Sequence, residues 1–305
     1  MKKSDLHTVI IILGPTAVGK TGLSVSLADH FKTEIISADS RQCYKELNIG
    51  VAKPSSQQLE QVKHYFINSH SINEEVNAGS FEILALAAAD KIFQHNIKAV
   101  MVGGTGLYIR SFCEGMDEMP KVEEATRKKI ISSYEEEGMV WLQNEVQKND
   151  PVFWETAEQQ NPHRLMRALE IFYTTGRSIS SFHQNKKTER PFNIIKIGLE
   201  LSKEHLHKNI NERVDQMMID GLELEAESLL PYRKLNALQT VGYKELSDHF
   251  DGKCSLKEAV EQIKTNTRQY AKRQMTWFKK DKDVNWYDAS GISVEKLVKD
   301  LLKDF

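Results

Sequence analysis

The sequence has little cysteine, no long apolar run and almost no net charge. Its three cysteines, Cys43, Cys113 and Cys254, lie far apart and form no C-x-x-C pair, which argues against a cysteine-ligated zinc site and a disulfide framework. Such sparse cysteine is typical of a reducing cytosol, so we expect a cytoplasmic protein. The apolar run at residues 9–13 has only five residues, too few for a signal-peptide core or a membrane span. We therefore expect no membrane segment.

The net charge of −2 over 305 residues excludes a protein whose whole surface is basic, so any nucleic-acid-binding surface must be local. One stretch, residues 264–282, holds seven lysines and arginines and a single acidic residue. Most charge runs are solvated helix faces. A contact with a phosphate backbone is comparably well supported here, because the rest of the chain is acidic. Lys272 and Arg273, at the centre of this basic stretch, are the candidates for that contact.

Short β-branched apolar runs alternate with helical periodicity through most of the chain. A continuous apolar run such as residues 9–13 is typical of a central strand in a parallel sheet that is covered on both faces. The alternation predicts an α/β fold with a doubly wound, mainly parallel sheet. Expected strands cover residues 9–13, 34–38, 99–102, 193–201 and 284–287. One helix is expected directly after the first glycine-rich turn. Further helices are expected at residues 81–95, at residues 203–220 and from Ser255 to about residue 280.

Residues 117–190 differ from the rest, because they contain no convincing strand. Asn161 has the side chain of a helix N-cap, and Pro162 suits the first turn of the same helix. We expect an all-helical insertion domain here, between two parts of an α/β core formed by residues 1–116 and 191–305. The insertion is either a separate substrate-binding lobe or a passive helical cap, and the sequence alone supports both equally.

A complete phosphate-binding motif, G-x-x-x-x-G-K-[ST], lies between the first expected strand and the helix after it, which is the context that this motif requires. Its glycines let backbone N–H groups converge on phosphate oxygens, and the helix N-terminus adds positive potential. Lys20 supplies a cation for the terminal phosphates, and Thr21 supplies a hydroxyl for Mg²⁺. The sequence therefore predicts a P-loop NTPase-like core that uses Mg²⁺. The motif consists of Gly14, Pro15, Thr16, Ala17, Val18, Gly19, Lys20 and Thr21.

The motif identifies the phosphates of a ligand but not the reaction. Most such loops bind ATP or GTP, so ATP and other nucleotides are candidate ligands. Enzymes that hydrolyse them usually carry an aspartate at the end of an apolar strand. The strand expected at residues 99–102 ends instead in Gly103, Gly104 and Thr105. This pattern argues against a nucleotide-hydrolysing motor or switch and leaves group transfer between a pyrophosphate-bearing donor and an acceptor.

Asp39 ends the second expected strand. Ligands of parallel sheets bind at the carboxyl ends of the strands, so this carboxylate should lie near the phosphates held by the P-loop. It can accept a proton from a nucleophile, or hold Mg²⁺ through water. An aspartate in this position can also serve only as a turn or helix cap. We favour the functional role on position alone.

Beyond the P-loop, ordered motifs run along almost the whole chain. They are GPTAVGKT at 14–21, ISADSRQCYKELNIGVAKP at 36–54, GGTGLYIRS at 103–111, NPHRLMRALEI at 161–171, NERVDQM at 211–217, VGYKEL at 241–246 and TRQYAKRQMTWFK at 267–279. Jointly they resemble the tRNA dimethylallyltransferases, a family also called tRNA isopentenyltransferases. The sequence contains no cysteine–histidine zinc finger of the kind seen in some eukaryotic relatives, so a compact bacterial-type enzyme is expected.

The resemblance implies an enzyme that transfers a dimethylallyl group from dimethylallyl pyrophosphate to the exocyclic amine of the adenine at tRNA position 37, next to the anticodon, and releases pyrophosphate. In this family the P-loop grips the leaving group, and Lys20, Thr21, Mg²⁺ and backbone amides would stabilise the charge that develops on it. Arg213 matches an arginine that also holds the pyrophosphate, and its planar fork suits two phosphate oxygens. Asp39 matches the general base that takes a proton from the amine.

The resemblance also implies contacts with the anticodon stem-loop of tRNA, whose loop bases can be splayed out and captured in a pocket. Thr105 matches a residue that contacts the adenosine. His163 departs from the glutamine of the family pattern, so an imidazole would make that hydrogen bond. Together with Lys272 and Arg273 of the basic stretch, the candidate tRNA-binding residues are Asp39, Ser40, Arg41, Gln42, Thr105, His163, Arg164, Leu165, Met166 and Arg167.

Two other classes of protein share some of these features. A small-molecule kinase that uses ATP would share the P-loop and an aspartate after the second strand, but it requires neither the basic stretch nor the ordered motifs. An RNA-binding module with a vestigial nucleotide site would not need intact Lys20, Thr21 and Asp39. We therefore expect a monomeric, Mg²⁺-dependent enzyme whose partners are dimethylallyl pyrophosphate and tRNA.

Overall fold

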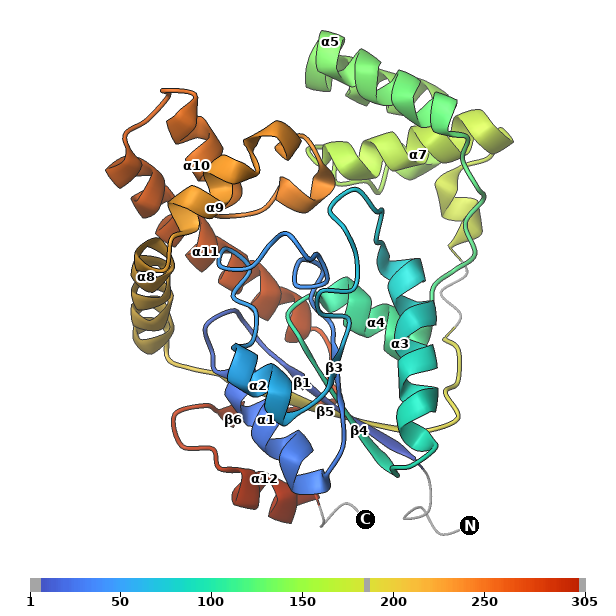
Figure 1. Cartoon of the computed structure of the whole chain (residues 1–305). Helices are drawn as coiled ribbons and strands as arrows, with labels where there is room; N and C mark the ends of the chain where they lie inside the picture. Colours follow the sequence, from blue (N-terminus) through green and yellow to red (C-terminus); the bar gives the residue numbers. More distant parts are fainter. Residues whose placement is uncertain (1–6, 184–186, 302–305) are drawn as a thin grey trace. The chain divides into compact units, whose positions relative to one another are not determined.

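The computed structural model of the protein describes residues 7–183 and 187–301. At its centre lies a six-stranded sheet in the order β3-β2-β4-β1-β5-β6, and every neighbouring pair of strands runs parallel (Figure 1). The first strand lies between the fourth and the fifth, so the chain crosses over the sheet between strands. The strands are β1 (Thr8–Leu13), β2 (Ile35–Ser37), β3 (His64–Tyr65), β4 (Lys98–Gly103), β5 (Asn193–Glu200) and β6 (Val284–Asp288).

Helices make up most of the rest of the α/β part. They are α1 (Lys20–Phe31), α2 (Ser56–Gln61), α3 (Ala78–Phe93), α4 (Gly106–Glu114), α8 (Lys203–Ile219), α9 (Leu222–Ser228), α10 (Tyr243–Phe250), α11 (Leu256–Phe278) and α12 (Val294–Leu301), with short 3-10 helices η3 (Leu230–Tyr232) and η4 (Asn236–Leu238). Some of them, such as α1 and α3, contact the strands directly. Figure 1 shows α1 with α12 and α3 with α4 packed about the strands.

Both faces of the sheet are covered, because successive residues of a strand point to opposite sides. Val9 and Ile11 of β1 lie in one buried cluster with side chains of α3 and α4. Ile10 and Ile12 lie in a second buried cluster with side chains of α1 and α12. A strand with two buried faces needs apolar residues at every position, which explains the unbroken apolar run. The predicted doubly wound α/β fold with a parallel sheet is confirmed.

The chain divides into two compact units, one formed by Met1–Glu114 with Glu189–Phe305 and the other by Gly115–Thr188. We predicted a helical insertion at residues 117–190, and the described part of the second unit contains helices and no strand. Its own core forms where α5 packs on α7, around side chains such as Leu142 and Leu169. The elements of this unit are α5 (Glu124–Asn149), α6 (Pro151–Trp154), α7 (Pro162–Thr175) and η2 (Ile179–Phe182).

The predicted beginning of α7 is confirmed. The side chain of Asn161 accepts a hydrogen bond from the Arg164 N–H at 3.2 Å, and Pro162 is the first helical residue. Gly176 ends the helix in the left-handed conformation, with φ of 68°. An N-cap acceptor, a first-turn proline and a C-terminal glycine satisfy the helix ends locally, so the sequence alone marks them.

One strand was not predicted. β3 has only two residues, which pair with Ile35 and Ile36 of β2 at the edge of the sheet. Two residues are too few to show the alternation by which strands are recognised. Among the helices of the described residues, none has both the length and the apolarity that a bilayer span requires.

The ends of β2 and β4 approach each other closely. A side chain on Gly103 would overlap the carbonyl group of Ala38, and the Thr105 N–H donates a hydrogen bond to the same carbonyl at 3.2 Å. Asp39 follows Ala38 directly in the chain. The small Gly103 therefore lets the two strand ends meet at the edge of the sheet where the candidate site lies.

Candidate active site

The phosphate-binding loop follows β1 and opens α1. Three of its residues, Gly14, Ala17 and Gly19, have positive φ values of 146°, 64° and 99°. A side chain at Gly14 would also come within 2.6 Å of the Leu199 carbonyl oxygen on β5, so only glycine fits there. Lys20 is the first residue of α1, whose N-terminal N–H groups face the loop. The strand, loop and helix that the motif predicted are confirmed.

Helices α8 and α11 hold this loop from outside. The buried carboxamide of Gln274, on α11, accepts a hydrogen bond from the Thr16 N–H at 2.8 Å and donates one to the Gly104 carbonyl oxygen at 2.9 Å. Asn209, on α8, donates to the Ala17 carbonyl oxygen at 3.2 Å. Neither side chain was predicted. Nothing in the sequence indicates that a glutamine contacts a loop 258 residues away.

Two cationic side chains converge on the loop. The Lys20 ammonium donates hydrogen bonds to the carbonyl oxygens of Gly14 at 3.0 Å and Pro15 at 2.7 Å. Arg213 reaches the loop from α8 and donates from its guanidinium to the Thr16 hydroxyl at 3.3 Å. By sequence alone Arg213 is an ordinary helix arginine that only the family resemblance singled out. The structure brings it to the P-loop.

Both cations are partly removed from water. Burial, and second to it the charge of Arg213, lower the pKa of Lys20 to about 7, whereas Asp39 acts in the opposite direction. Burial also lowers the pKa of Arg213. An anion placed beside them would favour their charged forms and strengthen their interaction with it, because little water screens the site. The two desolvated cations beside the loop therefore favour binding of an anion such as a phosphate group.

Asp39 lies at the carboxyl end of β2, as predicted. Its Oδ1 atom accepts hydrogen bonds from the N–H groups of Arg41 at 2.9 Å and Gln42 at 3.3 Å. The carboxylate thus caps the turn that follows β2, which was the alternative role considered for it. Thr105 supports the same turn, because its hydroxyl accepts a hydrogen bond from the Ser40 N–H at 3.0 Å. The structure brings these predicted residues together at one end of the sheet.

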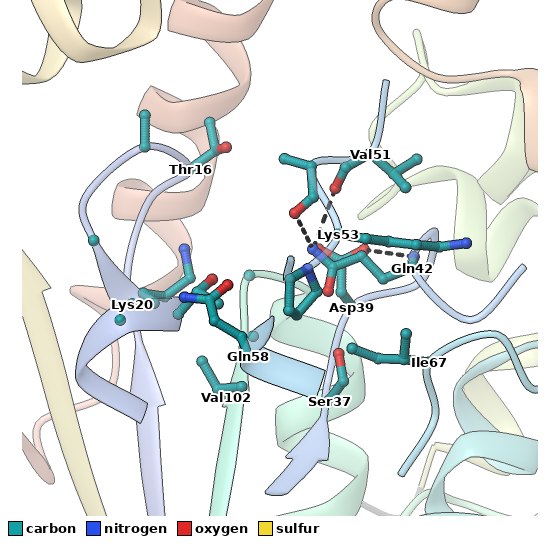
Figure 2. Close-up of a pocket in the computed structure, with 18 of the residues that line it drawn as sticks. Thr16, Lys20, Ser37, Asp39, Gln42, Val51, Lys53, Gln58, Ile67 and Val102 are labelled. Atoms are coloured by element: carbon teal, nitrogen blue, oxygen red, sulfur yellow. Dashed lines mark hydrogen bonds between the residues drawn. The ribbon is translucent and has the colours of Figure 1, made fainter. Parts of the chain in front are cut away.

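A cavity of about 350 Å³ lies between the P-loop and the end of β2. Figure 2 shows Lys20 on one side of this cavity, with Asp39 and Gln42 on the other. The Gln42 amide fixes a wall by donating to the carbonyl oxygens of Val51 at 3.2 Å and Ala52 at 3.0 Å (Figure 2). The predicted residues that line the cavity are Thr16, Ala17, Gly19, Lys20, Thr21, Asp39, Gln42 and Arg213.

Several residues that line the cavity were not predicted as site residues, and some predicted P-loop residues are not among those that line it. Unpredicted members include Lys53, Gln58, His64, Tyr270 and Gln274. Gly14, Pro15 and Val18 shape the loop but are not among the residues that line the cavity. Their contribution is the backbone path that positions Lys20 and Thr21.

Thr21 and Asp39, the two residues that the sequence suggested for Mg²⁺, both line the cavity, and each offers a side-chain oxygen. Within the described residues, no group of three or more histidine, cysteine, aspartate or glutamate side chains could hold a metal ion. Mg²⁺ commonly binds through one or two protein oxygens, substrate phosphates and several waters. The lining therefore fits a Mg²⁺ ion that arrives with a pyrophosphate, rather than one held by the protein alone.

A second cavity, of about 120 Å³, adjoins the first, and the two share Thr16, Asp39, Val51, Ala52, Arg213 and Tyr270. Much of its remaining wall is apolar, and α8, α9 and α11 contribute to it. Asp39 therefore faces a cationic cavity and an apolar one. The apolar side chains are Val51, Ala52, Val214, Met217, Leu222, Val241 and Ile263.

The wall at residues 50–52 is held in place by Glu225 of α9. Its carboxylate accepts hydrogen bonds from three consecutive backbone N–H groups, those of residues 48–50, at 2.9–3.2 Å. The Tyr243 hydroxyl donates to the same carboxylate. Four donors on one carboxylate fix the path of this loop. Glu225 was not predicted, because a glutamate on a short helix ordinarily faces solvent.

The predicted tRNA-contacting segment of α7 lies in the helical unit and is of mixed exposure. His163 and Arg164 are exposed at the beginning of the helix. Leu165 is fully buried in the core of that unit, and Met166 packs against the same core. Arg167 forms an ion pair with a glutamate of its own helix at 2.8 Å. The Leu165 side chain therefore belongs to the core rather than to an RNA-facing surface.

The basic stretch 264–282 is partly neutralised within the fold. Lys264 and Lys279 each form an ion pair with an acidic residue of another element, at 2.8 and 2.7 Å. Lys272 and Arg273, by contrast, are exposed on α11. The exposed pair fits both interpretations considered for this stretch, a solvated helix face and a phosphate contact, and it remains the candidate for a phosphate contact.

Comparison with known proteins identifies the family. Residues 42–281 match the family described as IPP transferase, which is more than half of the chain. The chain belongs to the IPP transferase family. A tRNA dimethylallyltransferase from Christiangramia forsetii is 49% identical over 280 residues, which cover 92% of this chain and 93% of that protein. The tRNA dimethylallyltransferase 1 from Phocaeicola vulgatus is 45% identical, with the same coverage of both chains, 92% and 93%.

Solved structures of the IPP transferase family share the fold. A tRNA isopentenylpyrophosphate transferase from Bacillus halodurans aligns with a TM-score of 0.71 and 34% identity over 97% of this chain and 94% of that chain. A eukaryotic dimethylallyltransferase described as acting on tRNA aligns with a TM-score of 0.77 and 30% identity, over 92% of this chain and 74% of that chain. The family resemblance that the ordered motifs indicated is confirmed.

We expect the affinity for inorganic pyrophosphate to fall as the pH rises through about 7, because Lys20 loses its positive charge there. A lysine is charged below its pKa and the anion favours the charged form. Affinity should therefore be high on the acid side and decrease by up to about tenfold per pH unit on the alkaline side. Calorimetric measurement of pyrophosphate binding across this pH range tests the effect. Lys20→Met is the control, because its pH profile reports only the protonation of pyrophosphate itself. Identical pH profiles for the two proteins would contradict the assignment.

Proposed function

We propose that the chain transfers a dimethylallyl group from dimethylallyl pyrophosphate to the exocyclic amine of the adenine at tRNA position 37, next to the anticodon, and releases pyrophosphate. The observation that carries the proposal is the position of Asp39, which lines the cationic cavity at the P-loop and also the apolar cavity beside it. The relatives named as tRNA dimethylallyltransferases support the choice of donor and acceptor.

The leaving group fits the cationic cavity. Lys20, Arg213 and the N-terminal N–H groups of α1 lie where the pyrophosphate would bind. As the carbon–oxygen bond breaks, its electron pair passes to the pyrophosphate, whose negative charge increases. Cations and N–H groups already in place stabilise this charge more in the transition state than in the bound substrate. The desolvation that lowers both pKa values also strengthens this attraction.

The dimethylallyl group fits the apolar cavity. The apolar cavity has a volume of about 120 Å³. A cavity of about 150 Å³ holds benzene, which has six carbons, so this somewhat smaller cavity suits the five carbons of a dimethylallyl group. As the bond to oxygen weakens, positive charge spreads over three allylic carbons. Apolar walls keep water away from these carbons, so the amine rather than water attacks.

Asp39 is placed to take the proton. The exocyclic amine of adenine is a weak nucleophile, because its lone pair is delocalised into the ring. As the nitrogen–carbon bond forms, one N–H proton passes to the Asp39 carboxylate and leaves a neutral secondary amine. The hydrogen bonds from the Arg41 and Gln42 N–H groups to Oδ1 fix the orientation of this carboxylate.

We propose Mg²⁺ as the cofactor. The Thr21 hydroxyl would bind it directly and Asp39 through water, consistent with the oxygen-bearing lining of the cavity. When bound, Mg²⁺ neutralises part of the pyrophosphate charge and makes it a better leaving group.

The acceptor tRNA needs a surface outside the two cavities. We propose that phosphate contacts position the RNA while the turn after β2 receives the base. The described cysteines Cys43, Cys113 and Cys254 are free thiols, which is consistent with action in the cytoplasm. The proposed tRNA-contacting residues are Ser40, Arg41 and Gln42 after β2, Thr105 beside them, His163, Arg164, Met166 and Arg167 on α7, and Lys272 and Arg273 on α11.

The function is tested by giving the protein Mg²⁺ and unmodified tRNA with either prenyl-labelled dimethylallyl pyrophosphate or ATP labelled in its terminal phosphate. We expect prenyl label in the tRNA, and no transfer to a tRNA that carries another base at position 37. Transfer of phosphate label, with no prenyl label in the RNA, would overturn the proposal and favour a kinase.

We expect Asp39→Asn to lower the single-turnover rate of prenyl transfer by about 10²–10⁴-fold, the usual contribution of general-base catalysis. An amide cannot take the proton, but its oxygen can still accept the Arg41 and Gln42 hydrogen bonds that cap the turn. Binding of pyrophosphate and the melting temperature should therefore stay close to wild type. A rate within a factor of about two of wild type would remove Asp39 from the mechanism.

We expect the double substitution Lys272→Ala with Arg273→Ala to weaken binding of all tRNAs similarly, because phosphate contacts do not read sequence. The slope of log affinity against log salt should become less steep by roughly 0.7–0.9 for each lost phosphate contact. Filter binding over a salt series measures this. Lys257→Ala, exposed on the same helix outside the basic stretch, is the matched control and should keep the wild-type slope. An unchanged slope with a lowered melting temperature would assign the pair to structure.

A further inference from the structure

The apolar cavity has one end that adjoins the phosphate cavity and one end that does not. Thr16, Arg213 and Tyr270 line both cavities, so they mark the end at which a prenyl chain would join its pyrophosphate. Ile263 lines the apolar cavity from α11, seven residues before Tyr270, which is about 10 Å along the helix axis. Leu222 lines it from the first turn of α9, beyond the end of α8. Ile263 and Leu222 therefore form the end away from the phosphates.

This far end is closed by the protein core. Leu222 has no exposed surface, and Ile263 is 2% exposed. Both belong to the buried cluster that also contains Val214 and Leu246. Protein interiors are packed as densely as organic crystals, so a chain cannot extend past these residues without displacing core side chains. A longer chain therefore needs another way out of the cavity.

The wall at Met217 is different, because a third cavity, of about 600 Å³, lies on its other side. The described residues that line both the apolar cavity and this third cavity are Ala52, Arg213 and Met217. Ala52 has a methyl group alone, and the guanidinium of Arg213 donates to the Thr16 hydroxyl in the P-loop. The half-buried side chain of Met217 is therefore the main apolar barrier between the two cavities.

Met217 also lies at a suitable distance from the phosphate site. It follows Arg213 by four residues, so the two side chains lie on the same face of α8, about 6 Å apart along its axis. A chain that starts at a pyrophosphate beside Arg213 thus meets Met217 within a few carbon–carbon bonds. Methionine is unbranched and flexible, which suits a side chain that fills the space behind a short prenyl group.

We propose that Met217 determines the length of the prenyl chain that the site accepts. It leaves room for the five carbons of a dimethylallyl group and blocks the ten carbons of a geranyl group. The inference rests on the proposed function, which supplies a prenyl pyrophosphate as the donor. Truncation of Met217 would join the apolar cavity to the third cavity, where Ile49, Pro54 and Leu59 offer apolar surface to a longer chain.

The experiment compares three variants of the full chain with wild type. Met217→Ala removes the barrier, whereas Met217→Leu keeps a side chain of similar volume. Met218→Ala is the matched control, because Met218 is also half-buried and packs against the same core but is not among the residues that line either cavity.

The ligands are isoamyl pyrophosphate and tetrahydrogeranyl pyrophosphate, the saturated analogues of the five-carbon and ten-carbon donors. They lack the allylic double bond that spreads positive charge over three carbons, so they bind without reacting. Calorimetry measures their affinities in the presence of Mg²⁺. Inorganic pyrophosphate is the reference ligand, and its affinity should be the same in all four proteins, because Met217 does not line the phosphate cavity.

We expect wild type to bind the five-carbon analogue more tightly than the ten-carbon one. Met217→Ala should shift the ratio of the two affinities toward the longer chain by about 10–200-fold, the range over which an apolar pocket discriminates ligands by size. Met217→Leu and Met218→Ala should keep the wild-type ratio. An unchanged ratio in Met217→Ala overturns the proposal, as does an equal shift in Met218→Ala.

Wild-type protein provides a second test if Met217→Ala does not fold, as judged by its melting temperature. With ¹³C-labelled methionine methyl groups, the Met217 resonance is identified by its absence from Met217→Leu. This resonance should move when isoamyl pyrophosphate binds and stay in place when inorganic pyrophosphate binds. The same response to both ligands overturns the proposal.

Neither test uses tRNA, so the two proposals fail separately. A protein whose preference for chain length depends on Met217, but which does not prenylate tRNA, would refute the proposed function and not this inference. A protein that prenylates tRNA, and whose Met217→Ala variant keeps the wild-type ratio, would refute this inference alone.

Discussion

The carboxamide of Gln274 joins three parts of the molecule that lie far apart in the sequence. A carboxamide can accept a hydrogen bond from one backbone group and donate one to another, so a single side chain on α11 ties the Thr16 N–H to the Gly104 carbonyl. Gly104 and Gly106 have no room for a side chain, because Gln274 and Trp277 occupy that space. The shape of the P-loop, and hence the direction of its cations, depends on this close packing of α11 against the ends of the strands.

Once the loop is fixed, the electrostatics of the site follow. Lys20 and Arg213 are held beside each other in a partly desolvated place, where burial lowers the pKa of both. This arrangement is unfavourable by itself and becomes favourable when an anion is bound, so it selects a highly charged ligand. Asp39 lies at the boundary between this cationic cavity and an apolar one. A pyrophosphate ester of a short hydrocarbon has the matching division between charged and apolar parts.

Much of the α/β framework was predictable from the sequence, because its signals are local. The apolar run of β1, the glycines of the P-loop and the Asn161 N-cap each act through neighbouring residues, and the structure has them as expected. The ordered motifs indicated the family, and relatives that match over 92% of the chain bear this out. The P-loop alone indicated only a phosphate ligand, so the reaction depended on residues such as Arg213 that have no local signal.

The tertiary structure decided which side chains meet. Local periodicity and short motifs determine where strands, helices and the phosphate-binding loop form, since those depend on interactions between residues close in sequence. Whether Glu225 holds the cavity wall, whether Leu165 is core or surface, and whether Met217 lies between two cavities depend on elements that fold together from distant parts of the chain. Two residues of β3 carry no periodic signal, yet they place His64 at the phosphate cavity. The sequence therefore determined the scaffold and its ligand class, and packing over long sequence distances determined the detailed chemistry of the site.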